Sequence, residues 1–177
     1  FSRIPVIWNV QNGSLDPEQS PWTTRTVQRL CIPRSVRAAA IVYCAENAQS
    51  SHQAIGYQNK KSVVIENGTD LTLFKPDEES RTVFCDRNGI PRDTKIVGHG
   101  GRWDAQKDYP TLLAAMGLIA SDNKDTQFVL CGKDLHPDNP DLMKLVRKNG
   151  LKGRIHLLGM QKGMAQILPA FDVFLLT

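Results

Sequence analysis

KIVGHGGRWDAQKDYPTLLAAMGLIA, residues 95–120, contains the pattern that decides the fold. Its apolar run at 95–100 is long enough for a buried strand and too short for a helix, and a pair of glycines follows it. Apolar residues then recur at helical spacing over 109–121, behind Asp108 as a cap and with Pro110 in the first turn. The segment therefore predicts a strand, a glycine turn and a helix.

The same alternation runs through the rest of the chain. Short apolar runs predict further strands at 4–10, 40–44, 62–65, 126–132, 154–159 and 172–177. Helical spacing predicts helices at about 22–38, 46–55, 78–88, 140–150 and 162–170. Strands that alternate with helices form parallel sheets with right-handed crossovers, so we expect an α/β, doubly wound architecture with ligand loops at the carboxyl ends of the strands.

One stretch, ENGTDLTLFKPDEES at 66–80, interrupts this rhythm with an Asn-Gly pair, a proline and several acids. Such a composition is typical of a linker, and we divide the chain there into a domain at 1–67 and a domain at 68–177. The 177 residues suffice for one domain or for parts of two. The chain begins at Phe1 within one strand-like run and stops at Thr177 after another, so we expect both domains to be incomplete.

Composition favours an ordinary globular protein, with 41% hydrophobic and 23% charged residues. The formal charge of +4 is too small to indicate nucleic acid as a partner, and a solvated basic face explains it. No apolar run approaches the length of a membrane span. The four cysteines lack C-x-x-C spacing and are interpreted as buried, reduced thiols of a cytoplasmic protein: Cys31, Cys44, Cys85 and Cys131.

Several common classes of enzyme are disfavoured by missing motifs. GHGGRW at 98–103 has Trp103 where a dinucleotide-binding fingerprint needs its third glycine, and no P-loop occurs. The chain has no H-E-x-x-H, no Cys/His ligand cluster and no G-x-S-x-G. Nicotinamide dehydrogenases, P-loop NTPases, metal hydrolases and serine hydrolases therefore lack support.

A candidate anion site lies in GGRWDAQKDYPTLL at 100–113. Glycines allow close approach of the backbone to a ligand, the helix start offers unpaired N–H groups, and Arg102 and Lys107 lie beside them. This combination suits a diphosphate. The alternative is that both cations are solvated loop charges.

Four stretches of the sequence resemble the motifs of the family 4 retaining glycosyltransferases, which have the GT-B fold. IENGTDLTLFKPD at 65–77 is similar to their interdomain signature, and GRWDAQKDYPTLLAA at 101–115 to their Arg-x4-Lys motif. FVLCGKD at 128–134 and IHLLGMQKGMAQILPAFDVFLLT at 155–177 resemble the loops that follow. The resemblance implies two incomplete Rossmann-like domains, the end of the acceptor domain at 1–67 and the start of the donor domain at 68–177.

The resemblance also implies a reaction, the transfer of a sugar from a nucleotide-diphosphate sugar to a glycan or lipid-linked acceptor in polysaccharide biosynthesis, with retention. Arg102 and Lys107 would then be catalytic, since cations placed where charge develops stabilise the leaving diphosphate without a metal or other cofactor. The implied donor-binding residues are Gly100, Gly101, Gly132, Gly159 and Met160, for which strand-end turns and plain packing are the alternatives. A peripheral association with the inner face of the membrane stays open.

Two departures from the family leave other functions open. Gln11, Asn12 and Gly13 stand where the family commonly has a histidine, and its Glu-x7-Glu motif would follow Thr177. We therefore expect the chain as given to be inactive. The alternatives for the parent protein are a non-catalytic module that binds a nucleotide or phosphosugar, and a GT-B sugar-nucleotide epimerase.

The histidines give no catalytic signal of their own. His99 and His156 fall inside strand-like runs and are interpreted as hydrogen-bonded core or rim residues. His52 and His136 are predicted to lie at the surface.

Overall fold

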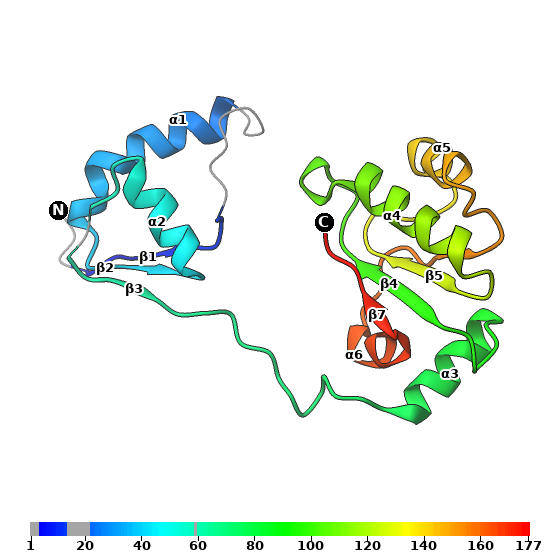
Figure 1. Cartoon of the computed structure of the whole chain (residues 1–177). Coiled ribbons are helices and arrows are strands. Elements are labelled where there is room, and N and C mark those ends of the chain that lie inside the picture. Colours follow the sequence, from blue (N-terminus) through cyan, green and yellow to red (C-terminus); the bar gives the residue numbers. More distant parts are fainter. Residues whose placement is uncertain (1–3, 14–21, 59) are drawn as a thin grey trace. The chain divides into compact units, whose positions relative to one another are not determined.

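The computed structural model describes residues 4–13, 22–58 and 60–177. The chain divides into two compact units, Phe1–Thr69 and Asp70–Thr177 (Figure 1). The predicted division between Asn67 and Gly68 lies two residues before this boundary. Each unit has its own sheet and its own hydrophobic core.

The first unit contains a three-stranded parallel sheet. Its strands are β1 (Ile7–Val10), β2 (Ala40–Tyr43) and β3 (Ser62–Val64), paired in the order β1-β2-β3. The helix α1 (Trp22–Cys31) and the 3-10 helix η1 (Ile32–Arg37) lead to β2, and α2 (Glu46–Ala54) leads to β3. The buried core residues of this unit are Ile41, Tyr43, Ala48 and Tyr57.

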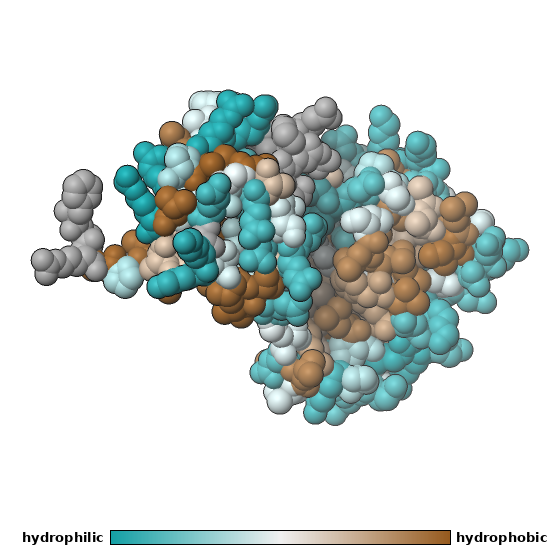
Figure 2. All heavy atoms as spheres, turned by 60° about the vertical axis from the view of Figure 1, so that its left-hand side comes forward, coloured by the Kyte–Doolittle hydropathy of each residue, from teal (hydrophilic) through white to brown (hydrophobic). Residues whose placement is uncertain are grey.

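Much apolar surface of the first unit is uncovered. Helix α1 has no fully buried side chain, and Trp22, Val27 and Leu30 are exposed. Figure 2 shows hydrophobic residues (brown) among hydrophilic ones on the face turned to the reader. The core of this unit is therefore small in relation to the apolar side chains that it carries.

Two predicted helices change character at a proline. The helix expected at 22–38 is α-helical only as far as Cys31, and η1 continues it around Pro33. The helix expected at 162–170 is α6 (Met164–Ile167) followed by the 3-10 helix η3 (Leu168–Ala170) around Pro169. Proline has no N–H to donate and its ring clashes with the carbonyl four residues earlier, so neither α-helix extends to its predicted end.

The second unit contains a four-stranded parallel sheet in the order β6-β5-β4-β7. The strands are β4 (Ile96–Gly100), β5 (Gln127–Cys131), β6 (Ile155–Leu157) and β7 (Val173–Phe174). The further helices are α3 (Glu78–Asn88), the 3-10 helix η2 (Ala105–Lys107), α4 (Tyr109–Asp122) and α5 (Pro140–Lys148). The predicted α/β architecture with parallel strands is confirmed, and α4 matches the helix predicted at 109–121 to within one residue.

Strand alternation gives this sheet two buried faces (Figure 1). Val97, Phe128 and Leu130 pack with α4 and α5 on one face, while Ile96, Val129 and Cys131 pack with α3 and α6 on the other. A strand covered on both sides needs apolar residues at successive positions, which explains the continuous apolar runs of the sequence.

The strand order changes direction at β4. From β4 the chain proceeds outward to β5 and then β6, and it returns to pair β7 with the other side of β4. The loops at the carboxyl ends of the strands on the two sides of such a switch point diverge and leave a crevice, which is where doubly wound folds bind ligands. Among the described residues, no helix is long and apolar enough to cross a membrane.

Candidate functional site

Backbone packs directly against backbone at the ends of β4 and β5. Gly101 N donates a hydrogen bond to Cys131 O at 2.9 Å, and a Cβ built on Gly132 would lie 1.8 Å from Gly101 O. No side chain fits in that space, so Gly132 is required by the structure and not only permitted in it.

The loop after β6 joins the same arrangement. Gly132 N donates to Gly159 O at 2.7 Å, and Gly159 N donates to Leu135 O at 2.9 Å. Gly159 has a φ of +63°, the left-handed region that glycine adopts without strain. The glycines predicted to bind the donor therefore hold three carboxyl-edge loops together.

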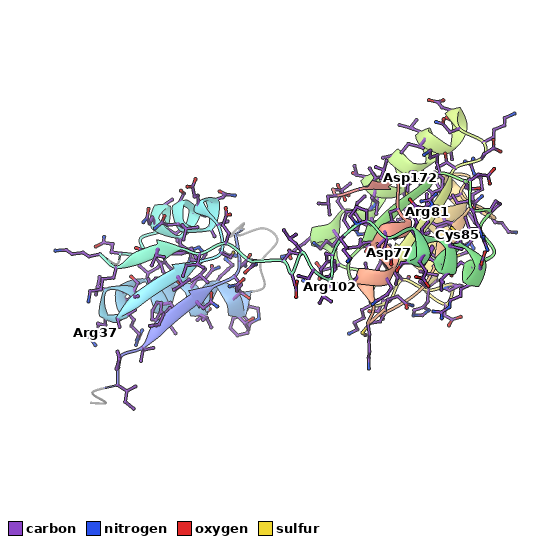
Figure 3. The ribbon with its side chains drawn as sticks, turned by 90° about the horizontal axis from the view of Figure 1, so that it is seen from below. Arg37, Asp77, Arg81, Cys85, Arg102 and Asp172 are labelled. Carbon is purple, nitrogen blue, oxygen red and sulfur yellow. The ribbon has the colours of Figure 1, made fainter. Side chains whose placement is uncertain are left out.

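Arg102 directly follows Gly101 in the chain (Figure 3). Its Nε donates to Asp104 Oδ2 at 3.0 Å, and 61% of its side chain is exposed. Trp103 N donates to Lys133 O at 2.9 Å, which fixes the backbone of this loop against the loop after β5. The Gln106 N–H and then the Arg102 guanidinium stabilise the Asp104 carboxylate and lower its pKa.

Lys107 ends the 3-10 helix η2, one residue before the N-cap of α4. Its carbonyl accepts a hydrogen bond of 2.8 Å from Thr177 Oγ1, which joins this loop to the chain after β7. Asp108 adopts a φ of +37° and its carboxylate accepts from Thr111 N at 3.3 Å, as the predicted cap of α4.

A cavity of about 370 Å³ opens among these loops. It contains five of the seven predicted site residues, whereas Gly159 and Lys107 are not part of its lining. The sequence did not assign the remaining lining residues to the site. Tertiary packing brings three of them, from α6, η3 and β7, to this edge. The lining is Gly100, Gly101, Arg102, Cys131, Gly132, Met160, Gln161, Met164, Leu168 and Phe174.

His99 lies behind the glycine pair and is 1% exposed. Its Nδ1 donates to Leu175 O at 2.9 Å, and its ring stacks on Phe174. Burial lowers its pKa, with a smaller contribution in the same direction from the charge of Lys107. The prediction of a core histidine is confirmed for its position, but within the described part of the chain Nε2 has no hydrogen-bond partner.

The other histidines divide differently from the prediction. His52 was expected at the surface and this is wrong, because its ring is 4% exposed, bonds to Ala48 O through Nδ1 and packs on Tyr43 and Tyr57. His156 is a half-buried rim residue that contacts Gln127 Oε1 at 3.0 Å, and burial lowers its pKa. His136 is partly exposed beside Asp138. The free cysteines are buried at Cys85 and Cys131 and only half-buried at Cys31 and Cys44.

Comparison with known proteins relates this architecture to glycosyltransferases. No protein-family model matches the chain. Over 161 residues the chain is 26% identical to a Bacillus subtilis (strain 168) protein named "Putative glycosyltransferase EpsF", covering 88% of this chain and 40% of that protein.

Two solved structures give the same relation. HepE of Anabaena, in complex with UDP-glucose, superposes with a TM-score of 0.84 at 22% identity over 99% of this chain and 47% of its own. WaaG, a glycosyltransferase involved in lipopolysaccharide biosynthesis, gives a TM-score of 0.71 at 14% identity over 99% of this chain and 51% of its own. The chain thus spans about half the length, or less, of the proteins that it matches. Over that span it has the GT-B fold, with both Rossmann-like domains incomplete.

Proposed function

We propose that the chain is part of a glycosyltransferase, and that its second unit binds the diphosphate of a nucleotide-sugar donor. The observation that carries this proposal is the cavity at the carboxyl edge, where Gly100, Gly101 and Gly132 present bare backbone beside the guanidinium of Arg102. A diphosphate needs close backbone approach and a fork of donors for its oxygens, and arginine supplies such a fork. The cavity also has the size of a small-molecule site.

One similar structure supports UDP as the nucleotide, and two similar proteins support a transferase as the parent. HepE carries UDP-glucose in its crystal structure, and EpsF and WaaG are both named as glycosyltransferases. In this proposal Arg102 and Lys107 stabilise the leaving diphosphate in place of a metal, and the sugar is transferred with retention to a glycan or lipid-linked acceptor.

The experiment is a calorimetric titration of the 177-residue chain with UDP, GDP and ADP at moderate salt. UDP is expected to bind best, and Arg102→Ala and Lys107→Ala are each expected to weaken it by about 10- to 100-fold, the effect of losing a charge-assisted hydrogen bond. Excess EDTA should leave the affinity unchanged. Arg92→Ala is the matched control, because Arg92 is an exposed cation that precedes β4 and pairs with Asp86, at the amino edge of the sheet.

The absence of binding to all three nucleotides by a folded chain would contradict the donor site. A non-catalytic binding module is the alternative, favoured by the amides that follow β1, where Gln11 Nε2 donates to Asn9 Oδ1 at 2.7 Å and no histidine stands. The two functions differ in the longer protein: without its acceptor a transferase slowly hydrolyses the donor, because water takes the sugar and the nucleoside diphosphate leaves, whereas a module only binds the donor.

A further inference from the structure

We propose that Asp104 is a positioning residue that orients both cations of the donor site. This inference rests on the proposed function, because it assigns the two cations to the diphosphate. Asp104 lies two residues after Arg102 and three before Lys107. Its carboxylate accepts a hydrogen bond from Arg102 and caps the turn that carries Lys107.

The contact with Arg102 selects which edge of the guanidinium stays available. Asp104 Oδ2 accepts from Nε at 3.0 Å, so the edge formed by the two terminal nitrogens remains for the ligand. That edge is the one that matches two oxygens of a phosphate group. Because Arg102 lines the cavity, Asp104 fixes a long side chain that would otherwise sample many rotamers beside the site.

The contacts of Asp104 with the backbone form the turn that carries Lys107. Asp104 Oδ1 accepts from Gln106 N at 3.0 Å and the Asp104 carbonyl accepts from Lys107 N at 3.0 Å, which together form the 3-10 helix η2. Lys107 is the last residue of that helix. Asp104 therefore holds the Arg102 side chain through its carboxylate, and it holds the backbone turn that ends at Lys107 through its carboxylate and its carbonyl.

Stability alone does not explain an acid at this position. An ion pair with side chains 61% and 31% exposed contributes little to folding, and a carboxylate beside a diphosphate repels the ligand. Ordering a flexible side chain before the ligand arrives does offset part of that repulsion, because binding then no longer has to order it.

The first measurement is nuclear magnetic resonance of the Arg102 Nε–H group in the chain without ligand. We expect a distinct, slowly exchanging signal in the native chain, lost in Asp104→Asn and Asp104→Ala. Asparagine keeps Oδ1, which caps η2, but carries an NH2 group in place of Oδ2, and this group cannot accept from Arg102 Nε. This variant therefore separates the ion pair from the cap. An unchanged signal in both variants would overturn the proposal, and this result does not depend on nucleotide binding.

The second measurement is UDP affinity. Asp104→Ala is expected to weaken UDP binding by about three- to tenfold, the effect of one or two side chains that must be ordered on binding, and Asp104→Asn by less. In an Arg102→Ala background the loss should shrink, because the residue that Asp104 orients is gone. Equal or tighter binding by Asp104→Ala, or an equal loss in both backgrounds, would overturn the proposal, whereas a native chain that binds no nucleotide contradicts only the donor site.

Asp77 provides the matched control. Its carboxylate caps α3 by accepting from Glu79 N at 3.2 Å, in the same manner as Asp104 caps η2, but Asp77 does not line the cavity. Asp77→Ala should lower the melting temperature and leave both UDP affinity and the Arg102 signal unchanged.

Discussion

At the scale of single residues, Gly132 is where the demands of fold and site coincide. Its missing side chain lets the loop after β5 lie against Gly101 O, and an added Cβ would overlap that oxygen at 1.8 Å. The obstacle is backbone, which cannot turn aside as a side chain can. We therefore expect Gly132→Ala to lower the free energy of unfolding by about 3 kcal/mol, as severe overpacking does, measured by chemical denaturation.

Two other glycines calibrate this effect. A Cβ added to Gly159 would meet no atom, but the residue has a φ of +63°, so Gly159→Ala should lower the free energy of unfolding by only about 1 to 2 kcal/mol. Gly68 has open space and no positive φ, and Gly68→Ala should change little. A Gly132→Ala variant as stable as Gly68→Ala would show that the two loops separate easily.

His99 predicts a dependence of stability on pH. Burial favours its neutral form, so its pKa is lowered in the folded chain and the unfolded chain binds a proton first as the pH falls. Its contribution to stability is therefore complete above about pH 6.5, the ordinary histidine pKa, and is lost as the pH falls from there toward the lowered pKa. Burial also lowers the pKa of His156, so this residue adds to the loss of stability as the pH falls.

The measurement is the denaturation midpoint of the native chain and of His99→Gln between pH 7.5 and 5. The groups around His99 are the carbonyl of Leu175, the rings of Phe174 and Tyr109 and the charge of Lys107. The slope with pH should be smaller in His99→Gln, and smaller still when His156→Gln is added. Parallel curves for the native and variant chains would contradict the assignment.

At the scale of elements, Arg81 links α3 to the edge of the second sheet (Figure 3). Its guanidinium donates to Ala170 O at 2.7 Å, to Thr94 O at 2.9 Å and to Asp172 Oδ2 at 3.3 Å. Truncation removes this donor from Ala170 O and Thr94 O, whereas Asp172 still accepts from Ile96 N and Lys95 Nζ. Arg81→Ala should therefore lower the free energy of unfolding by about 2 to 3 kcal/mol. Chemical denaturation of the variant gives the value.

An exposed ion pair on the same unit serves as the control for Arg81. Arg92 and Asp86 approach to 2.6 Å, but their side chains are 64% and 53% exposed. Solvent and salt screen such a pair, and Arg92→Ala should leave the denaturation midpoint unchanged. If Arg81→Ala and Arg92→Ala were equally stable, the hydrogen bonds of Arg81 would contribute nothing to the free energy of unfolding.

Elements with a strong local signal could be predicted from the sequence, and those set by tertiary contacts could not. The helix over 109–121 has its cap, its proline and its apolar spacing in one stretch, and α4 follows it closely. The apolar run at 172–177 predicted a strand of that length, but β7 comprises only Val173 and Phe174. Leu175 N still donates to Gly98 O of β4, and beyond that bond Leu175 O accepts from His99 while Thr177 Oγ1 donates to Lys107 O.

The residues of the candidate site also differ in whether a local sequence pattern identifies them. Gly101, Arg102 and Gly132 stand next to strand ends and could be found from the sequence. Cys131 and Phe174 read as core residues, and Met164 as part of a helix, because the side-by-side arrangement of β7 and β4 is not encoded in any local stretch. The ion pair of Asp104 likewise needs a three-dimensional structure to be seen.

At the scale of the whole molecule, each hydrophobic cluster of the described residues lies within a single unit of the chain. The core of the first unit is formed by residues between Trp8 and Val64, and both cores of the second by residues between Phe84 and Leu175. The second unit also holds every residue that lines the candidate donor cavity. Folding of the second unit and binding of a nucleotide should therefore be independent of the first.

Separate expression of the two units tests this independence. The separate chain 70–177 is expected to unfold cooperatively and to bind UDP within about twofold of the 177-residue chain, as sites without shared contacts behave. The separate chain 1–69 is expected to be unstable, because its core is small and Trp22, Val27 and Leu30 stay exposed. The measurements are circular dichroism during heating and calorimetric titration with UDP. An unfolded 70–177 chain would mean that contacts with the first unit stabilise the donor half, and a folded one that no longer binds would place part of the nucleotide site before Asp70.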